Sequence, residues 1–194
     1  VKLIQTACLK AAELSAELLV TPELSLWGYP PRDLLFNPLL LSQQSQVLEA
    51  LVKSISLNSP ELSVLVGIAE QAPDLQLPQL FNAIALVDKS GWEVVARKQL
   101  LPVYDVFDEK RYFRPSNETG VLQLCIKGKV TRIGITICED LWVEEELQGT
   151  RLIGPDRIAQ LKGKRLDLLL NISASPFSQA KESLRMHLAN RAVK

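Results

Sequence analysis

Cys138 is the side chain of this sequence best placed to act as a nucleophile. It ends the apolar run 133–137 (IGITI) and is followed at once by Glu139 and Asp140. The carboxyl ends of strands are where α/β sheets place their functional sites. The alternative is structural, because a free cysteine is often a small buried apolar residue at the end of a strand. Position alone therefore makes Cys138 a candidate and leaves both interpretations open.

A thiol needs a group that removes its proton, because the thiolate is the attacking species. His187 is the single histidine of the chain, and it falls in a predicted helix near the C-terminus. A Ser-His-Asp triad would have to take its base from that one residue. We interpret His187 instead as a helix-surface or packing residue. A carboxylate or a lysine must then activate the thiol.

Two charged residues lie at the ends of other apolar strands. Glu23 follows Pro22 where the first predicted strand ends, and Lys98 follows the predicted strand 92–96. A sheet can bring strand ends that are distant in sequence together, so Glu23, Lys98 and Cys138 form a candidate catalytic set. Each one alone has a simpler explanation, since a glutamate or lysine at a strand end is usually a solvated charge.

The other two cysteines are expected to be packing residues. Cys8 lies on the apolar face of the first predicted helix, and Cys125 lies inside a predicted hairpin. The three cysteines are odd in number, and no two are spaced like the thiolate ligands of a zinc site. The sequence therefore predicts free thiols, a reducing compartment and no metal site.

Apolar periodicity predicts an α/β domain with a mixed sheet, because strands alternate with helices through both hairpins and crossovers. The connection 99–120 is polar and aromatic, and loops of that length usually serve a site. Helices are expected at 3–14, 38–57, 155–161 and from about 180, and strands at 17–21, 63–69, 81–87, 92–96, 121–126, 130–137 and 166–172.

Bulk composition excludes several classes of protein. The 194 residues suit one domain, and 22 basic residues balance 22 acidic ones. A net charge of zero argues against a broad nucleic-acid or anionic-membrane surface. No stretch reaches the roughly 20 apolar residues of a membrane span, and the first residues do not resemble a signal peptide, so a cytoplasmic location is expected. Without a glycine-rich phosphate loop, nucleotide binding is not expected in this segment.

Three segments in a fixed order make the pattern specific. The segments 21–24 (TPEL), 97–102 (RKQLLP) and 134–140 (GITICED) resemble the catalytic motifs of the nitrilase superfamily, which supply glutamate, lysine and cysteine in that order. Nearly the whole chain resembles the glutaminase domains of glutamine-dependent NAD synthetases. That resemblance is carried by 28–35 (GYPPRDLL), 107–113 (FDEKRYF), 138–142 (CEDLW) and 171–177 (NISASPF).

The resemblance implies a four-layer α-β-β-α sandwich that hydrolyses glutamine and feeds ammonia to a synthetase domain of the same polypeptide. ATP and magnesium would act in that other domain, which amidates nicotinic acid adenine dinucleotide to NAD, and this segment would need no cofactor. A homo-oligomer is expected. The implied supporting carboxylates are Glu109 and Glu139, and the implied glutamine-pocket residues are Tyr29, Tyr104, Trp142, Ser175 and Lys181.

The sequence departs from the family at both ends. Family domains begin with a strand before the first helix and continue with further strands after the last. We therefore expect residues 1–194 to be a partial glutaminase domain, with sheet edges uncovered unless another chain completes them. Two other hypotheses stay open: a stand-alone amidase or carbamoylase of the same superfamily, and an inactive truncated domain that only binds or oligomerises.

Overall fold

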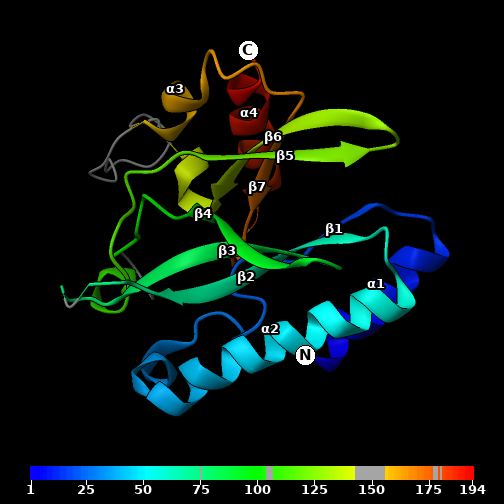
Figure 1. Cartoon of the computed structure of the whole chain (residues 1–194). Helices are drawn as coiled ribbons and strands as arrows, with labels where there is room; N and C mark the ends of the chain where they lie inside the picture. The colour runs from blue at the N-terminus through cyan, green and yellow to red at the C-terminus, as the bar shows by residue number, and fades with distance from the viewer. Residues whose placement is uncertain (75, 104–106, 143–155, 177–178, 180) are drawn as a thin grey trace.

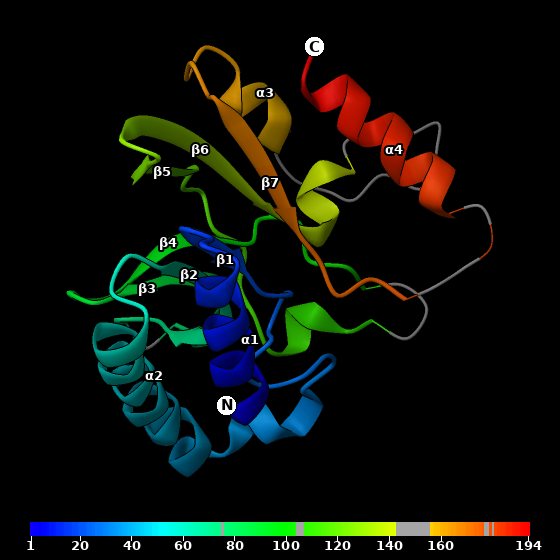
Figure 2. The ribbon, with the colours of Figure 1, turned by 90° about the vertical axis from the view of Figure 1, so that its right-hand side faces the viewer.

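The computed structural model describes residues 1–74, 76–103, 107–142, 156–176, 179 and 181–194. Two sheets face each other, and helices cover their outer faces (Figures 1 and 2). Helices α1 (Lys2–Glu13) and α2 (Pro38–Asn58) lie on one outer face, while α3 (Arg157–Leu161) and α4 (Lys181–Ala192) lie on the other. The predicted four-layer α-β-β-α sandwich is confirmed.

The first sheet contains β1 (Leu18–Val20), β2 (Ser63–Gln71), β3 (Leu80–Asp88) and β4 (Gly91–Arg97), hydrogen-bonded in that order. Strands β1 and β2 are parallel because α2 forms the crossover between them. The other pairs are antiparallel, with the tight turn between β3 and β4 at the predicted hairpin.

The second sheet contains β5 (Gly120–Ile126), β6 (Lys129–Ile137) and β7 (Leu168–Ile172). Strands β5 and β6 are antiparallel, and β6 and β7 are parallel. Periodicity predicted a mixed sheet, and the chain forms two of them. Three short 3₁₀ helices complete the described elements: η1 (Arg32–Phe36), η2 (Glu109–Arg111) and η3 (Cys138–Leu141).

The apolar core fills the space between successive layers. Alternate residues of β2 point in opposite directions, so Val64 and Val66 pack against the helices whereas Leu65 faces the second sheet. A strand buried on both faces is apolar at nearly every position, which explains the continuous run 63–69. Leu141, Ile158 and Leu188 join η3, α3 and α4 in an outer cluster.

Cysteine placement matches one expectation and corrects another. Cys8 is buried on α1 as predicted, but Cys125 is exposed. The prediction for Cys125 was wrong because side chains alternate along β5. Leu122 and Leu124 pack towards the other sheet, whereas Gln123 and Cys125 point outward. His187 lies exposed on α4, as the sequence indicated. None of the described helices is both long and apolar enough to cross a membrane.

Gly67 allows the segment that carries Glu23 to lie directly on β2. A Cβ atom at position 67 would come within 2.3 Å of the Leu24 nitrogen and 2.4 Å of the Pro22 oxygen. The Leu26 N–H donates to the Gly67 carbonyl at 3.1 Å, and the Gly67 N–H donates to the Ser25 hydroxyl at 3.1 Å. A side chain at position 67 would push the 22–24 backbone off the sheet.

We therefore expect Gly67→Ala to lower the free energy of unfolding by about 1–3 kcal/mol or more, since backbone must move to admit the methyl group. Gly134→Ala is the matched control. Its new Cβ would meet the Leu166 side-chain end at 2.5 Å, and that side chain can rotate away. Urea unfolding of both variants gives the comparison. An equal loss in the two would contradict the role of Gly67.

Candidate active site

The structure brings Glu23, Lys98 and Cys138 together in the interior. Each follows a strand: Glu23 follows β1, Lys98 follows β4, and Cys138 follows β6. The first two strands belong to one sheet and the third to the other, so the site lies where strand ends of the two sheets meet. The three side chains are almost inaccessible, with Lys98 0%, Glu23 1% and Cys138 4% exposed.

The Lys98 ammonium group is the centre of the cluster. Its nitrogen lies 2.8 Å from Glu23 Oε1, 2.9 Å from Glu109 Oε1 and 3.0 Å from Glu139 Oε2. Burial by itself would lower the pKa of Lys98, but these three carboxylates outweigh it and raise the pKa well above its ordinary value. Lys98 therefore keeps its positive charge in a site closed to water.

Glu23 is fixed in place through both of its oxygens. The Asn82 side-chain amide donates to Oε1 at 2.8 Å, and the Ala174 N–H donates to Oε2 at 3.1 Å. The backbone carbonyl of Asn82 also accepts the backbone N–H of Lys98 at 2.8 Å. Sequence reasoning did not select Asn82, although a lone amide within the apolar strand 81–87 was a usable signal.

Cys138 begins η3 in a left-handed backbone conformation, with φ of +47°. Such a conformation is costly for a non-glycine residue and persists only where the surrounding structure enforces it. Burial raises the pKa of the Cys138 thiol, and the negative charges of Glu23 and Glu139 raise it further against the opposing effect of Lys98. The thiol is therefore protonated at rest and donates a hydrogen bond to the Glu139 carboxylate.

Two of the carboxylates have opposite pKa shifts. Burial raises the pKa of Glu109 from 4.5 to about 7, against the attraction of Lys98. The pKa of Glu139 also rises on burial, but Lys98 and the Cys138 thiol reverse that effect and leave it below its ordinary value. Glu109 thus carries a proton part of the time near neutral pH, whereas Glu139 stays ionised.

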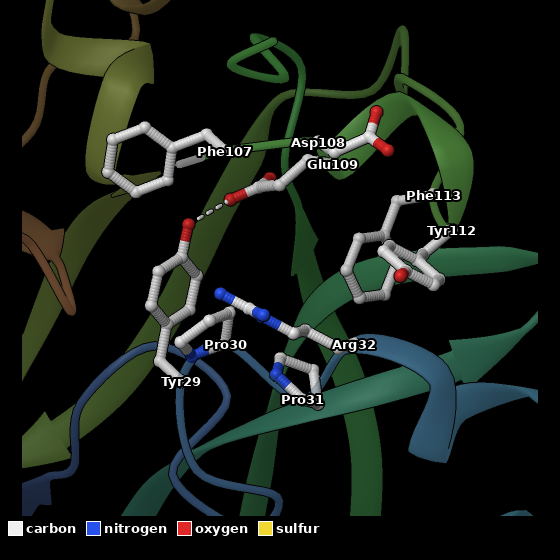
Figure 3. Close-up of a pocket in the computed structure, with 9 residues that line it drawn as sticks. All are labelled: Tyr29, Pro30, Pro31, Arg32, Phe107, Asp108, Glu109, Tyr112 and Phe113. Atoms are coloured by element: carbon white, nitrogen blue, oxygen red, sulfur yellow. Dashed lines mark hydrogen bonds between the residues drawn. The ribbon is translucent and has the colours of Figure 1, made fainter. Parts of the chain in front are cut away.

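Tyr29 connects the cluster to a cavity of about 250 Å³. Its hydroxyl donates to Glu109 Oε1 at 2.7 Å, and its ring lies 6.2 Å from that of Phe107. Figure 3 shows Tyr29 and Phe107 on one side of the cavity, Tyr112 and Phe113 on the other, and Glu109 between them. The Glu109 Oε2 atom is buried without a hydrogen-bond partner among the described residues.

The other predicted substrate residues lie on the η3 and α4 side of the cluster. The Lys181 ammonium sits 5.6 Å from the centre of the Trp142 ring. Ser175 follows Ala174, which holds Glu23, and it lines a second hollow of about 520 Å³ together with Lys181. Tyr104 lies outside the described residues. Within the described part of the chain, no group of three His, Cys, Asp or Glu side chains is arranged to hold a metal ion.

The site and the layered fold define a class of hydrolase, and comparison with known proteins agrees. Residues 1–193 match the carbon-nitrogen hydrolase family. The chain belongs to that family. Among curated relatives, the glutamine-dependent NAD(+) synthetase of Synechocystis sp. is 37% identical over an alignment that covers 98% of this chain and 34% of that protein. The synthetase of Thermotoga maritima is 34% identical over 90% of this chain and 27% of its own length.

Solved structures show the same arrangement. A glutamine-dependent NAD+ synthetase from Acinetobacter baumannii, in complex with ADP, superposes with a TM-score of 0.77 at 27% identity, over 98% of this chain and 33% of that one. An amidase from Nesterenkonia sp. shares the fold with a TM-score of 0.64 at 22% identity, over 98% of this chain and 64% of that one. The present chain spans about a third of the length of the synthetases that it matches.

The raised pKa of Glu109 predicts a distinctive pH dependence of stability. Between pH 4.5 and about 7 the folded protein keeps a proton on Glu109 that the unfolded chain has lost. The contribution of Glu109 to the free energy of unfolding is therefore largest below pH 4.5 and falls as the pH rises towards 7. The unfolding free energy of the wild type, minus that of Glu109→Gln, should fall over this range by on the order of 3 kcal/mol.

Urea unfolding at several pH values measures this difference. Glu61→Gln is the control, because the Glu61 side chain is 83% exposed and forms only a surface ion pair with Lys89. Its difference from the wild type should stay nearly constant over the same pH range. A constant difference for Glu109→Gln as well would show that the Glu109 carboxyl titrates normally.

Proposed function

We propose that this chain hydrolyses the side-chain amide of L-glutamine to glutamate and ammonia through a thioester on Cys138. The observation that carries the proposal is the buried cluster itself, in which a thiol, an ammonium and three carboxylates share one water-excluded site. Glutamine as the amide is supported by the names of the synthetase relatives, which match almost all of this chain.

The first step is acylation of the sulfur. The raised pKa of the Cys138 thiol means that its proton must be removed as it attacks, and Glu23 is the proposed base. The sulfur bonds to the amide carbon, the carbon–nitrogen bond breaks, and the leaving nitrogen takes the proton from Glu23 to form ammonia. Glu23 then removes a proton from water as the water oxygen attacks the thioester carbon. The carbon–sulfur bond breaks, glutamate is released, and Glu23 returns the proton to the sulfur to restore the thiol.

Lys98 is the proposed stabiliser of the charge that develops on the carbonyl oxygen. Its ammonium remains protonated because three carboxylates hold its pKa high. A fixed charge in a site closed to water stabilises an oxyanion more effectively than solvent does. The backbone N–H after the nucleophile, that of Glu139, is the proposed second donor.

Glutamine itself would be held by residues around the cluster. Glu109 orients the site through Lys98 and Tyr29, both of which it contacts. The cavity beside Tyr29, of about 250 Å³, is one candidate for part of the substrate path. The proposed glutamine-pocket residues are Tyr29, Tyr104, Trp142, Ser175 and Lys181.

The proposed use of the ammonia lies outside this chain. The relatives are named as glutamine-dependent NAD(+) synthetases, and this chain spans between about a quarter and a third of their length. We propose that the remaining part of such a polypeptide uses the ammonia, with ATP and magnesium, to amidate nicotinic acid adenine dinucleotide to NAD. The sandwich described above would then be its glutaminase domain, and a homo-oligomer is the proposed assembly.

Ammonia release from glutamine tests the reaction. Cys138→Ala should abolish the release, because no other described thiol lies in the cluster. Lys98→Met should reduce kcat by at least about a hundredfold to a thousandfold, the cost of losing one oxyanion donor, because it also leaves three buried carboxylates without their cation. Cys125→Ser, which removes an exposed thiol, should leave the rate unchanged. Release from N-carbamoyl compounds and not from glutamine would favour a carbamoylase instead.

A diazoketone analogue of glutamine tests the nucleophile directly. It should add one adduct to the wild-type chain, detected by intact mass, and none to Cys138→Ala. Peptide mapping should place the adduct on Cys138 and not on Cys8, which is buried on α1, or on Cys125. Failure to label the folded wild type would favour an inactive binding domain. An adduct that survives in Cys138→Ala would refute the assignment of the nucleophile.

A further inference from the structure

The relative position of Lys98 and Cys138 poses a structural problem, because the two residues follow strands of different sheets. Lys98 follows β4 and Cys138 follows β6, and the described strands of the two sheets form separate ladders. Apolar side chains such as Leu65 and Ile135 fill the space between the sheets. Apolar contacts are non-directional, so directional polar contacts across the seam add a restraint on this offset that apolar packing does not supply.

Asp140 forms such a contact. Its side chain is fully buried. Oδ1 accepts the N–H of Gln99 at 3.0 Å and the N–H of Leu100 at 2.8 Å, while Oδ2 accepts the N–H of Ile137 at 3.1 Å. Gln99 and Leu100 are the two residues after Lys98, and Ile137 is the residue before Cys138. One carboxylate therefore joins the backbones on which the ammonium and the thiol are mounted.

The link to Ile137 also bears on the shape of the turn at Cys138. Asp140 is the third residue of η3, and its side chain bonds back to the N–H of the residue that caps this turn. That bond closes the loop in which Cys138 takes its left-handed conformation. The same carboxylate thus holds the turn that presents the thiol and sets its distance from Lys98.

Arg157 of α3 acts on the Asp140 carboxylate through its positive charge. Its side chain is fully buried, and it donates hydrogen bonds to the Glu118 carbonyl and to Gln160. Burial raises the pKa of Asp140 above its ordinary value, although the N–H donors of Leu100 and Ile137 and the charges of Lys98 and Arg157 offset part of that rise. The carboxylate form, which can accept all three hydrogen bonds, is the form these neighbours favour.

We infer that Asp140 is a positioning residue that sets the Lys98 ammonium against the Cys138 thiol across the seam between the two sheets. The inference rests on the proposed role of Cys138 as the nucleophile and is independent of which amide the protein hydrolyses. A carboxylate that served only folding would affect stability alone. If the inference holds, Asp140 also affects the reactivity of the Cys138 sulfur, although its side chain need not contact that sulfur.

The test measures alkylation of Cys138 by iodoacetamide, which needs no turnover of glutamine. All variants carry Cys125→Ser, so the exposed thiol does not react, and peptide mapping assigns the product to Cys138 rather than Cys8. Asp140→Asn keeps the size of the side chain but cannot accept all three hydrogen bonds. We expect it to slow alkylation by about tenfold to a hundredfold, the scale of a misplacement near 1 Å.

The pH profile of alkylation separates positioning from simple loss of a charge. The charged groups that act on the thiol are Glu23 and Glu139, which disfavour the thiolate, and Lys98, which favours it. If Asp140→Asn lets Lys98 move away, the profile shifts to higher pH. Loss of a nearby negative charge alone would shift it to lower pH, and that result would overturn the inference.

A double-mutant comparison identifies Lys98 as the residue through which Asp140 acts. In a Lys98→Met background, Asp140→Asn should change the alkylation rate much less than in the wild-type background, because coupled residues are not additive. Additive effects would overturn the inference. So would a folded Asp140→Asn protein that is less stable but alkylates at the wild-type rate.

Asp167→Asn is the matched control. Asp167 also accepts a backbone N–H, that of Arg132 at 2.9 Å, but Arg132 lies in the first half of β6, away from the end that leads into Cys138. It should leave the alkylation rate unchanged.

Circular dichroism establishes which variants fold. If Asp140→Asn does not fold, Asp140→Glu keeps the charge while displacing the carboxylate, and the same rate, pH and double-mutant criteria decide the outcome. If the alkylation results agree but glutamine is not hydrolysed, the positioning inference stands and the proposed substrate falls.

Discussion

The structure of the site depends on one buried positive charge. Moving an ammonium group from water into a protein interior costs several kcal/mol even after the surroundings relax, unless opposite charges and hydrogen bonds compensate. Lys98 is completely buried, and Glu23, Glu109 and Glu139 surround it at 2.8–3.0 Å. These carboxylates come from three separate segments, after β1, in η2 and in η3. The need to neutralise Lys98 therefore ties distant parts of the chain to one point.

Three carboxylates around one ammonium would leave a buried excess of negative charge if all were ionised. The protein reduces this excess through Glu109, whose pKa rises to about 7. Glu139 stays ionised and accepts a hydrogen bond from the Cys138 thiol. Carboxyl groups of one chemical type thus receive different protonation states from their surroundings, which is a common way in which enzymes divide acid and base roles.

The second constraint is the seam between the sheets. Sheet ladders fix positions within each sheet, but catalysis here would require Glu23 and Lys98 of one sheet to meet Cys138 of the other. Polar contacts cross this seam at the site: Ala174 to Glu23, Glu139 to Lys98, and Asp140 to the backbone after Lys98. Close approach of backbone at Gly67 adds a steric condition on the segment that carries Glu23. The same contacts therefore contribute both to the stability of the fold and to the geometry that the proposed reaction requires.

The amino-acid sequence by itself determined the elements and the identity of the central residues. Apolar runs such as 63–69 and 133–137 predicted the strands, and the resemblance of three segments to nitrilase-superfamily motifs selected Glu23, Lys98 and Cys138. The strands and each motif taken singly are local features, because they depend on residue type and spacing along a few turns or pleats.

Only the tertiary structure decided which residues hold the site together. Asn82 and Asp140 are 59 and 41 positions from Glu23 and Gln99, the residues that they contact. Spacing along the chain carries no information about such pairs, since the packing of two separate sheets brings them together. The same holds for the exposure of Cys125, which depends on the face that β5 turns outward. Burial, protonation and offset across the seam are properties of the folded molecule, because each is a sum over neighbours that the fold alone assembles.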